Sequence, residues 1–466
     1  MTRILALERA VNETRLAVLE DGRLCEIYFE RGGQAGLTGN IYAGRVQNVL
    51  PGMNAAFVDI GMKRNGFLSA DDIDGELRPG RMVVVQVDKE PGGGKGPRLT
   101  GKISMPGRLT ALLPGIRYAG VSKKIAEGPE RDRLFAIASA LSEAHGHGLI
   151  VRTAGEGAFE EELAADYARL LLDWQRIEAE ARHSASPRLI RSDGDLALRA
   201  VRDMLNESVE RIRTDDEALY AQLRAHAEAL TPRFAERIEL VRTDTPLFDL
   251  LRVDHQLEQA LARRVNLKSG GNLVIDETEA LTVIDVNTAK FTGKRSLRET
   301  ILRLNCEAAD EIARQLRLRD VGGIVIADFI DMDSEDDRAA LIEHLRAALK
   351  DDPNRTNVLG MTALGLVELT RKKERQPLRR QLTHECAACG GTGREWSHER
   401  IAHRAARELW RRRRGGDVTA YRIVTGEKVA GWLKTIGLPE GGAARVDASG
   451  SDNGFEILPD DGGASR

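Results

Sequence analysis

The chain has 466 residues, of which 42% are hydrophobic and 30% are charged, and its formal net charge is −3. This length suggests about three domains of ordinary size, and the composition is typical of a soluble globular protein. The sequence contains no apolar run of 18 residues and no apolar core of an export signal, so we expect no membrane span and no export. Four cysteines are too few for a disulfide framework in a chain of this size, which predicts a cytoplasmic protein.

The first stretches of the chain have the alternation of β-strands. Residues 2–7 and 13–30 alternate apolar and polar side chains, and Asp21-Gly22 predicts a hairpin turn within the second stretch. We expect this region to be structural.

Residues 37–102 contain short β-runs separated by Gly, Asn and Pro. About five such strands predict a small closed barrel of the OB type. Phe57 and Phe67, with nearby cations such as Lys95, would suit a face on which single-stranded nucleic acid stacks, although both rings could instead be core. The run AAFVDIG…RNGFL resembles an S1-type RNA-binding domain, in which aromatic residues at these places face the RNA.

The next region contains the sequence VRTAG at residues 151–155, where a strand meets a Gly-rich turn and a helix. Arg152, Thr153 and the backbone N–H groups of such a turn could bind a phosphate. A plain helix entrance is the alternative. We expect a long helix to follow at residues 160–182.

Helical patterns dominate the following part of the chain. We expect one helix at residues 196–213, a charged helix at residues 217–230, and a third that ends at Gly270-Gly271, where a hairpin begins.

Two apolar, β-branched runs that contain aspartate follow: LTVIDVN at residues 281–287 and IVIADFIDM at residues 324–332. Both predict buried strands. Between them, residues 296–320 place Leu304, Ala308, Ile312 and Leu316 on one helical face. A strand–helix–strand crossover makes the two strands parallel, so Asp285 and Asp328 should lie at the same carboxyl edge, where open α/β sheets bind ligands.

Two neighbouring carboxylates repel each other unless a cation or a proton neutralises them. Mg²⁺ prefers one or two carboxylates, and Asn287, two residues after Asp285, would lie on the same strand face and could orient the site. The alternative is that these aspartates only end strands. Asp331 and Asp333 are weaker candidates, since they could begin the next helix.

The basic run RKKERQPLRR at residues 371–380 leads into HECAACGGTG. Cys386 and Cys389 have the C-x-x-C spacing of a tetrahedral Zn²⁺ site, and two chains could each donate one such pair. His384 as a ligand within one chain and a redox role are the alternatives. The arginines at 411–414, in a basic helix, could hold RNA phosphates or simply face solvent.

Six separated motifs occur in an order that resembles the ribonuclease E/G family. They are NAAFVDIG…GFL, GLIVRTAG, TVIDVNTAKF, LNCEAADEIARQLRLRD, VIADFIDM and CAACGGTG. The resemblance covers almost the whole chain to about residue 393, and it is nearer to the ribonuclease G type because no long C-terminal scaffold follows.

The resemblance implies an α/β multidomain fold. Its parts would be an RNase H-like scaffold with an inserted S1-type OB barrel and a 5′-sensor subdomain, followed by a DNase I-like catalytic subdomain, a zinc link and a small C-terminal domain. The expected boundaries are 1–36 with 197–260, then 37–102, 103–196, 261–381, 382–396 and 397–466, in that order.

The resemblance also implies roles for particular residues. Asp285 and Asp328 would bind catalytic Mg²⁺ with Asn287 orienting the site, and Cys386 and Cys389 would share structural Zn²⁺ with another protomer. Further implied contacts are Phe57, Phe67 and Lys95 with RNA, and Arg152, Thr153 and Gly120 with a 5′-monophosphate.

The expected function is metal-dependent endonucleolytic hydrolysis of single-stranded RNA to 5′-phosphate and 3′-hydroxyl ends. It would favour 5′-monophosphorylated substrates and act in rRNA and tRNA processing and in mRNA decay. Expected partners are rRNA precursors, mRNA and a second copy of the chain in a homodimer, with a homotetramer as a further option. The alternatives are a non-catalytic RNA-binding scaffold and a DNA nuclease.

Overall fold

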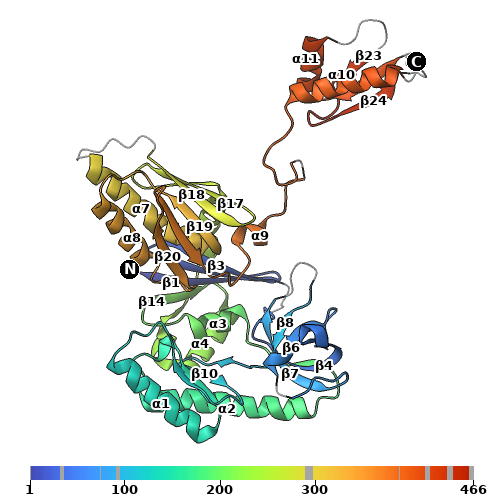
Figure 1. Ribbon diagram of the computed structural model, residues 1–466. Coiled ribbons are helices and arrows are strands. Elements are labelled where there is room, and N and C mark those ends of the chain that lie inside the picture. The colour runs from blue at the N-terminus through green and yellow to red at the C-terminus, as the bar shows by residue number, and fades with distance from the viewer. Residues whose placement is uncertain are drawn as a thin grey trace. The chain divides into compact units, whose positions relative to one another are not determined.

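The computed structural model describes residues 2–31, 36–73, 75–90, 95–288, 297–387, 389–414, 420–437 and 444–460. The architecture is mixed α/β, as predicted (Figure 1). The strands of the described residues form five sheets. The chain divides into two compact units, Met1–Leu378 and Arg379–Arg466. No helix in the described ranges is long and apolar enough to cross a membrane.

The first sheet joins N-terminal strands to strands from much later in the chain, in the order β15-β14-β1-β2-β3. Asp21 and Gly22 have positive φ angles of 47° and 76° between β2 and β3, which confirms the predicted hairpin turn. Helices α3 and α4 contribute to the core of this sheet. The elements are β1 (Arg3–Ala10), β2 (Glu13–Glu20), β3 (Arg23–Arg31), α3 (Leu196–Asp203), β14 (Val209–Thr214), α4 (Glu217–Leu230), η4 (Pro232–Arg237) and β15 (Ile238–Leu240).

Two predicted helix ends are wrong. The helix predicted at residues 196–213 stops at Asp203, and its second half is strand β14. The helix predicted to reach Gly270-Gly271 ends at Leu261, and β16 follows. In the first case β14 pairs with β1, which is far away in the sequence, and in the second case β16 pairs with the next strand, β17, in a hairpin. These strand hydrogen bonds override the helical pattern.

A closed barrel of five strands follows, as predicted, because β4 pairs with both β5 and β7. Its interior contains Val46, Val58, Leu68 and Val85, all buried. The elements are β4 (Ile41–Leu50), η1 (Pro51–Met53), β5 (Ala55–Asp59), β6 (Gly66–Ser69), η2 (Ala70–Asp72), β7 (Met82–Lys89), β8 (Arg98–Thr100) and β13 (Arg188–Arg191), which adds to β4 from outside.

The third sheet has the order β11-β12-β10-β9 and shares a core with two long helices, α1 and α2. The predicted helix at residues 160–182 is confirmed by α2. The elements are β9 (Met105–Pro106), β10 (Thr110–Leu113), β11 (Ala119–Val121), α1 (Pro129–His145), β12 (Gly148–Val151), η3 (Thr153–Gly155) and α2 (Glu160–Arg182).

The fourth sheet, in the order β16-β17-β18-β19-β21-β20, is covered by α7 and α8 (Figure 1). The predicted apolar face of α7 (Leu304, Ala308, Ile312 and Leu316) is buried against it; the predicted helix start at residue 296 lies outside the described residues. The elements are β16 (Arg264–Asn266), β17 (Asn272–Glu277), β18 (Leu281–Asn287), α7 (Leu297–Leu318), β19 (Gly323–Asp328), α8 (Glu335–Ala348), β20 (Thr356–Met361) and β21 (Leu366–Arg371). The two helices that precede them, α5 (Leu247–Leu250) and α6 (Val253–Leu261), contact β1 and β3 of the first sheet.

A buried ionic network joins the first and fourth sheets. Arg317 of α7 donates to Glu20 of β2 at 2.9 Å and to Glu26 of β3 at 2.6 Å, and all three side chains are buried. Removing one partner from such a group leaves an unpaired buried charge, so loss of any one of the three side chains should destabilise the contact of α7 with the first sheet.

The second unit has a three-stranded sheet, in the order β23-β22-β24, whose core includes residues of α10 and α11. The elements are α10 (His398–Arg414), β22 (Tyr421–Thr425), α11 (Glu427–Ile436), β23 (Ala444–Asp447) and β24 (Phe455–Pro459); the short helix α9 (Leu378–Leu382) precedes them at the boundary between the units.

Candidate functional site

Asp285 and Asp328 are direct partners in the parallel pairing of β18 with β19, as predicted. Their strand neighbours Ile284, Val286 and Ala327 are buried, whereas both aspartates are exposed. Because side chains alternate along a strand, the two carboxylates share the face that points away from this core.

Asn287 lies on the same face and bonds to Asp285. Its amide Nδ2 donates to Asp285 Oδ2 at 2.7 Å. This bond restricts the rotation of the Asp285 carboxylate, and the role of Asn287 in orienting the site stays a prediction.

The charge of Asp285 opposes the ionisation of Asp328. The pKa of Asp328 is raised above its ordinary value, first because the carboxyl is partly withdrawn from water and then because of the charges of Asp285 and Asp331. A bound cation would relieve this repulsion.

The donor set fits Mg²⁺ better than a metal that needs a full protein cage. In the parts of the chain that the structure describes, no group of three or more His, Cys, Asp or Glu side chains is placed to hold a metal ion. Two carboxylates alone are nevertheless sufficient for Mg²⁺, which completes its octahedral shell with water and substrate phosphate oxygens.

The loop after β19 is held by contacts that the sequence did not reveal. Asn305, fully buried on α7, donates from Nδ2 to the Ile330 carbonyl at 2.8 Å and accepts from the Ile330 N–H at 3.1 Å. Arg338 Nε donates to the Met332 carbonyl at 2.7 Å. The sequence signal that could have revealed this contact is an asparagine, next to Leu304, on a helical face that is otherwise apolar.

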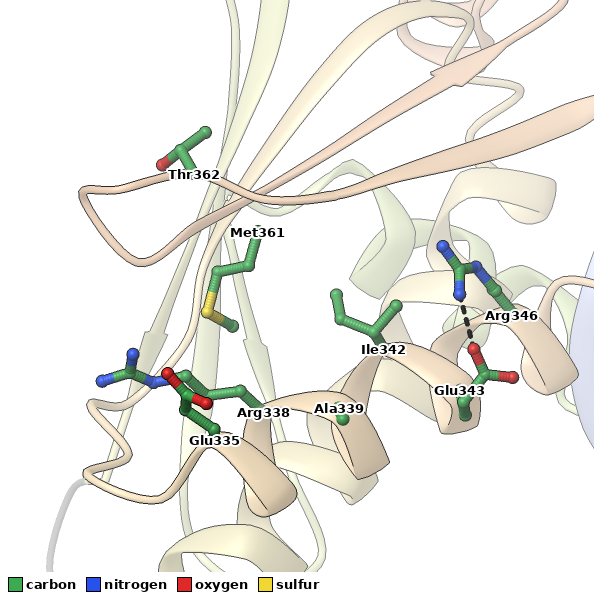
Figure 2. Close-up of a pocket in the computed structure, with 8 residues that line it drawn as sticks. All are labelled: Glu335, Arg338, Ala339, Ile342, Glu343, Arg346, Met361 and Thr362. Carbon is green, nitrogen blue, oxygen red and sulfur yellow. Dashed lines mark hydrogen bonds and ion pairs between the residues drawn. The ribbon is translucent and has the colours of Figure 1, made fainter.

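A cavity of about 400 Å³ lies elsewhere in this sheet region, between α8 and the β20–β21 hairpin (Figure 2). Ile342 and Met361 provide apolar surface, and Arg338 and Arg346 are at the sides (Figure 2). Neither Asp285 nor Asp328 lines it, so it is separate from the carboxylate pair.

The aromatic pair of the barrel is on the outer surface. Phe57 of β5 and Phe67 of β6 are cross-strand partners, with ring centroids 6.2 Å apart at an interplanar angle of 74°. Their neighbours Ala56 and Leu68 face the interior, so the core alternative is wrong for Phe57, which is 37% exposed. Lys95 is exposed, and no bond of its ammonium group with another described residue is present.

The two side chains of the VRTAG turn that were predicted to bind phosphate, Arg152 and Thr153, have different partners. Thr153 Oγ1 lies 2.8 Å from Ser122 Oγ, whereas Arg152 forms an ion pair with Asp203 at 2.8 Å and donates to the Gly107 carbonyl. Sequence reasoning missed Ser122 and Asp203, which come from other segments.

Gly120, in β11, has little space around it. A Cβ there would lie 2.7 Å from Tyr118 Cε1, so a side chain would displace that ring. Nearby, Arg131 donates to the carbonyls of Val121, Ser122 and Ile125, which shapes the loop that carries Ser122. This bracing arginine was not predicted.

Cys386 and Cys389 form a compact turn in the second unit. The Gly390 N–H donates to the Cys386 carbonyl at 2.8 Å, and the Gly393 N–H donates to Cys389 Sγ at 3.3 Å. The Gly393 bond is the largest influence that lowers the pKa of the Cys389 thiol, which favours the thiolate that metals bind.

Comparison with known proteins decides the family. The family model described as "Ribonuclease E/G family" matches residues 104–374, which include both aspartates. The chain belongs to the ribonuclease E/G family. The family that the six sequence motifs indicated is therefore confirmed.

Curated relatives from this family cover most of the chain. Ribonuclease G of Escherichia coli (strain K12) is 40% identical over 454 residues, 93% of each chain. Ribonuclease G of Haemophilus influenzae is 41% identical over 422 residues, 86% of this chain and 85% of the relative. Ribonuclease E of a Nostoc species is 43% identical over 373 residues, 76% of this chain and 54% of the relative.

Replacing Asp285 by Asn should lower the pKa of Asp328 toward the ordinary value of an aspartate. The substitution removes a negative charge that opposes ionisation of Asp328, so its carboxylate would form at lower pH. A titration of the Asp328 side-chain carboxyl carbon by NMR, in metal-free buffer, measures this shift. Asp331→Asn should give a smaller shift in the same direction, and an unchanged pKa in Asp285→Asn would show that the pair does not interact.

Proposed function

We propose that this protein is a metal-dependent endoribonuclease. It hydrolyses phosphodiester bonds of single-stranded RNA, leaves 5′-phosphate and 3′-hydroxyl ends, and acts in rRNA and tRNA processing and in mRNA decay. The observation that carries this proposal is the direct pairing of Asp285 with Asp328 on an exposed sheet face, in a member of a family whose relatives are named ribonucleases.

Asp285 and Asp328 would hold Mg²⁺, and the Asn287 amide keeps the Asp285 carboxylate in position. When bound there, the cation supplies Lewis-acid polarisation of the scissile phosphate and activation of water. The proposed catalytic face belongs to a DNase I-like subdomain, and the first sheet to an RNase H-like scaffold.

Binding of single-stranded RNA is proposed for the barrel. Phe57 and Phe67 provide aromatic faces on its outer surface, and Lys95 is an exposed cation. Bases stack on such rings without strong sequence preference, while cations near the backbone make binding weaken with salt. This combination fits an S1-type RNA-binding domain.

Recognition of a 5′-monophosphate is proposed for the turn at Arg152. The paired hydroxyls of Thr153 and Ser122 can donate to phosphate oxygens, and Gly120, which is buried in β11, lies two residues before Ser122. For Arg152 to join them, its guanidinium would exchange Asp203 for the phosphate.

The cysteine turn is proposed as half of a Zn²⁺ site. Cys386 and Cys389 supply two thiolates, and the same pair of a second chain would complete a tetrahedron. The protein would then be a cytoplasmic homodimer or an assembly of such dimers.

Asp285→Asn and Asp328→Asn should each lower cleavage of a single-stranded, A/U-rich RNA by about a thousandfold or more, since each removes a ligand of the catalytic cation. A gel-based cleavage assay with and without Mg²⁺ measures the loss. Binding of the same RNA should persist, because the proposed binding residues lie on the barrel.

Asp351→Asn is the matched control, because this exposed carboxylate is outside β18 and β19. Full activity in either active-site variant would remove the metal site from the proposal. Binding without cleavage by the parent protein would identify a scaffold, and equal cleavage of single-stranded DNA would identify a DNA nuclease.

Cleavage of RNAs that differ only at the 5′ end tests the proposed recognition of a 5′-monophosphate. The parent protein should cleave a 5′-monophosphorylated oligonucleotide about tenfold or more faster than its 5′-hydroxyl form, the size of effect expected for charged hydrogen bonds. Arg152→Ala and Thr153→Val should reduce this ratio, whereas Arg176→Ala on the exposed surface of α2 should keep it. Equal rates in the parent would show that VRTAG is only a turn.

Metal analysis of the purified protein should find about half a zinc ion per chain, because two thiolate pairs complete one tetrahedral site. Cys386→Ser should lose the zinc and the dimer, while Cys306→Ser, in α7, should keep both. One ion per chain would instead favour a site within one chain that uses His384.

A further inference from the structure

A second cavity, of about 250 Å³, lies between three segments of the first unit: the residues before β10, the start of α2 and the turn between α4 and η4. Its lining includes Arg108, Glu156, Phe159, Thr231 and Arg233. Neither Thr153 nor Gly120 lines it, so it is distinct from the proposed 5′-phosphate contacts.

Positive charge is concentrated at one part of this cavity. Arg108 is only 3% exposed; its terminal nitrogens donate to the carbonyls of Arg202 and Leu205, and its Nε has no partner among the described residues. Burial and then the nearby charges of Arg152 and Arg233 lower the pKa of Arg108 to about 10. A bound anion would offset the repulsion among the guanidinium groups of Arg108, Arg152 and Arg233.

Arg233 is the accessible cation of the cavity. Its side chain is 63% exposed, and its carboxylate contact, with Glu207, is a long one at 3.6 Å between two exposed groups. Exposed ion pairs of this kind contribute little, so a phosphate can compete for the guanidinium.

The cavity also has an aromatic face and a free carboxylate. Phe159 is 72% exposed at the start of α2, and its backbone N–H is bonded to Glu162 Oε2 at 2.9 Å. Glu156 is exposed, and its carboxylate forms no hydrogen bond or ion pair within the described ranges. Because Phe159 and Glu156 line the same cavity, a ring that stacks on Phe159 could also donate to Glu156.

We propose that this cavity binds a guanine nucleotide. The phosphate contacts Arg233 and the buried Arg108, the base stacks on Phe159, and its N1–H and N2–H₂ groups donate to Glu156. An ionised carboxylate only accepts hydrogen bonds, and guanine is the base whose edge presents two adjacent donors to it. The nucleotide is either free or a guanosine residue of an RNA chain.

Titration calorimetry of the full chain in EDTA, with GMP, AMP, UMP and inorganic phosphate, tests the assignment. GMP should bind saturably and at least about tenfold more tightly than the other three ligands, because only GMP uses all the contacts. Phe159→Ala and Arg233→Ala should each weaken GMP binding about fivefold or more, and Glu156→Gln should remove the preference for GMP over AMP.

Phe135→Ala and Arg176→Ala are matched controls, since both side chains are exposed and neither lines the cavity. Circular dichroism would verify that every variant is folded. A parallel titration of the parent protein and of Phe159→Ala uses a 5′-hydroxyl oligoribonucleotide with one guanosine: saturation by GMP supports a free nucleotide as the ligand, and oligonucleotide binding alone that Phe159→Ala weakens supports RNA, because the barrel is unchanged in this variant.

Three results would overturn the assignment: no saturation by either ligand, phosphate binding as tight as GMP binding, or unchanged affinity in both Phe159→Ala and Arg233→Ala. EDTA excludes divalent-dependent cleavage from the measurement. Failure of this site would thus be distinguishable from failure of the proposed nuclease, which depends on Asp285 and Asp328.

Discussion

The parallel, in-register pairing of β18 with β19 is the constraint on which the candidate active site depends. It brings Asp285 opposite Asp328 although α7 separates them in sequence. A slip of one residue would turn one of the aspartates toward the buried face, because strand side chains alternate. Burial of Ile284 and Ala327 against the helices therefore selects the register that exposes both carboxylates.

Buried ionic groups stabilise the region of this sheet. Arg317 joins α7 to Glu20 and Glu26 of the first sheet, and Arg371 of β21 bonds to Asp320 and Asp352 within the region of the fourth sheet itself. Breaking a buried pair of this kind costs about 3–5 kcal/mol in typical cases, since the remaining charge stays in the interior. The position of β19 therefore depends on residues that have no part in the proposed chemistry.

The candidate RNA contacts lie on other sheets than the carboxylate pair. Phe57 and Phe67 belong to the barrel, and Thr153 follows a strand of the third sheet. Arg152 connects that third sheet to α3, which packs on the first sheet, through Asp203, whose carboxylate also bonds to Arg202 at 2.8 Å. Recognition of the RNA and its cleavage are therefore proposed for separate surfaces, so variants can affect one without the other.

Local sequence patterns were sufficient to predict the elements whose structure depends on residues that are close in sequence. The β-branched runs around Asp285 and Asp328, the apolar face of α7 and the five barrel strands followed from alternation and helical spacing, because burial repeats with the period of each element. The tertiary structure alone decided that residues 209–214 form a strand, that Arg152 pairs with Asp203 and that Asn305 holds the loop after β19. These features depend on contacts between distant segments, and no short-range pattern encodes which segments will meet.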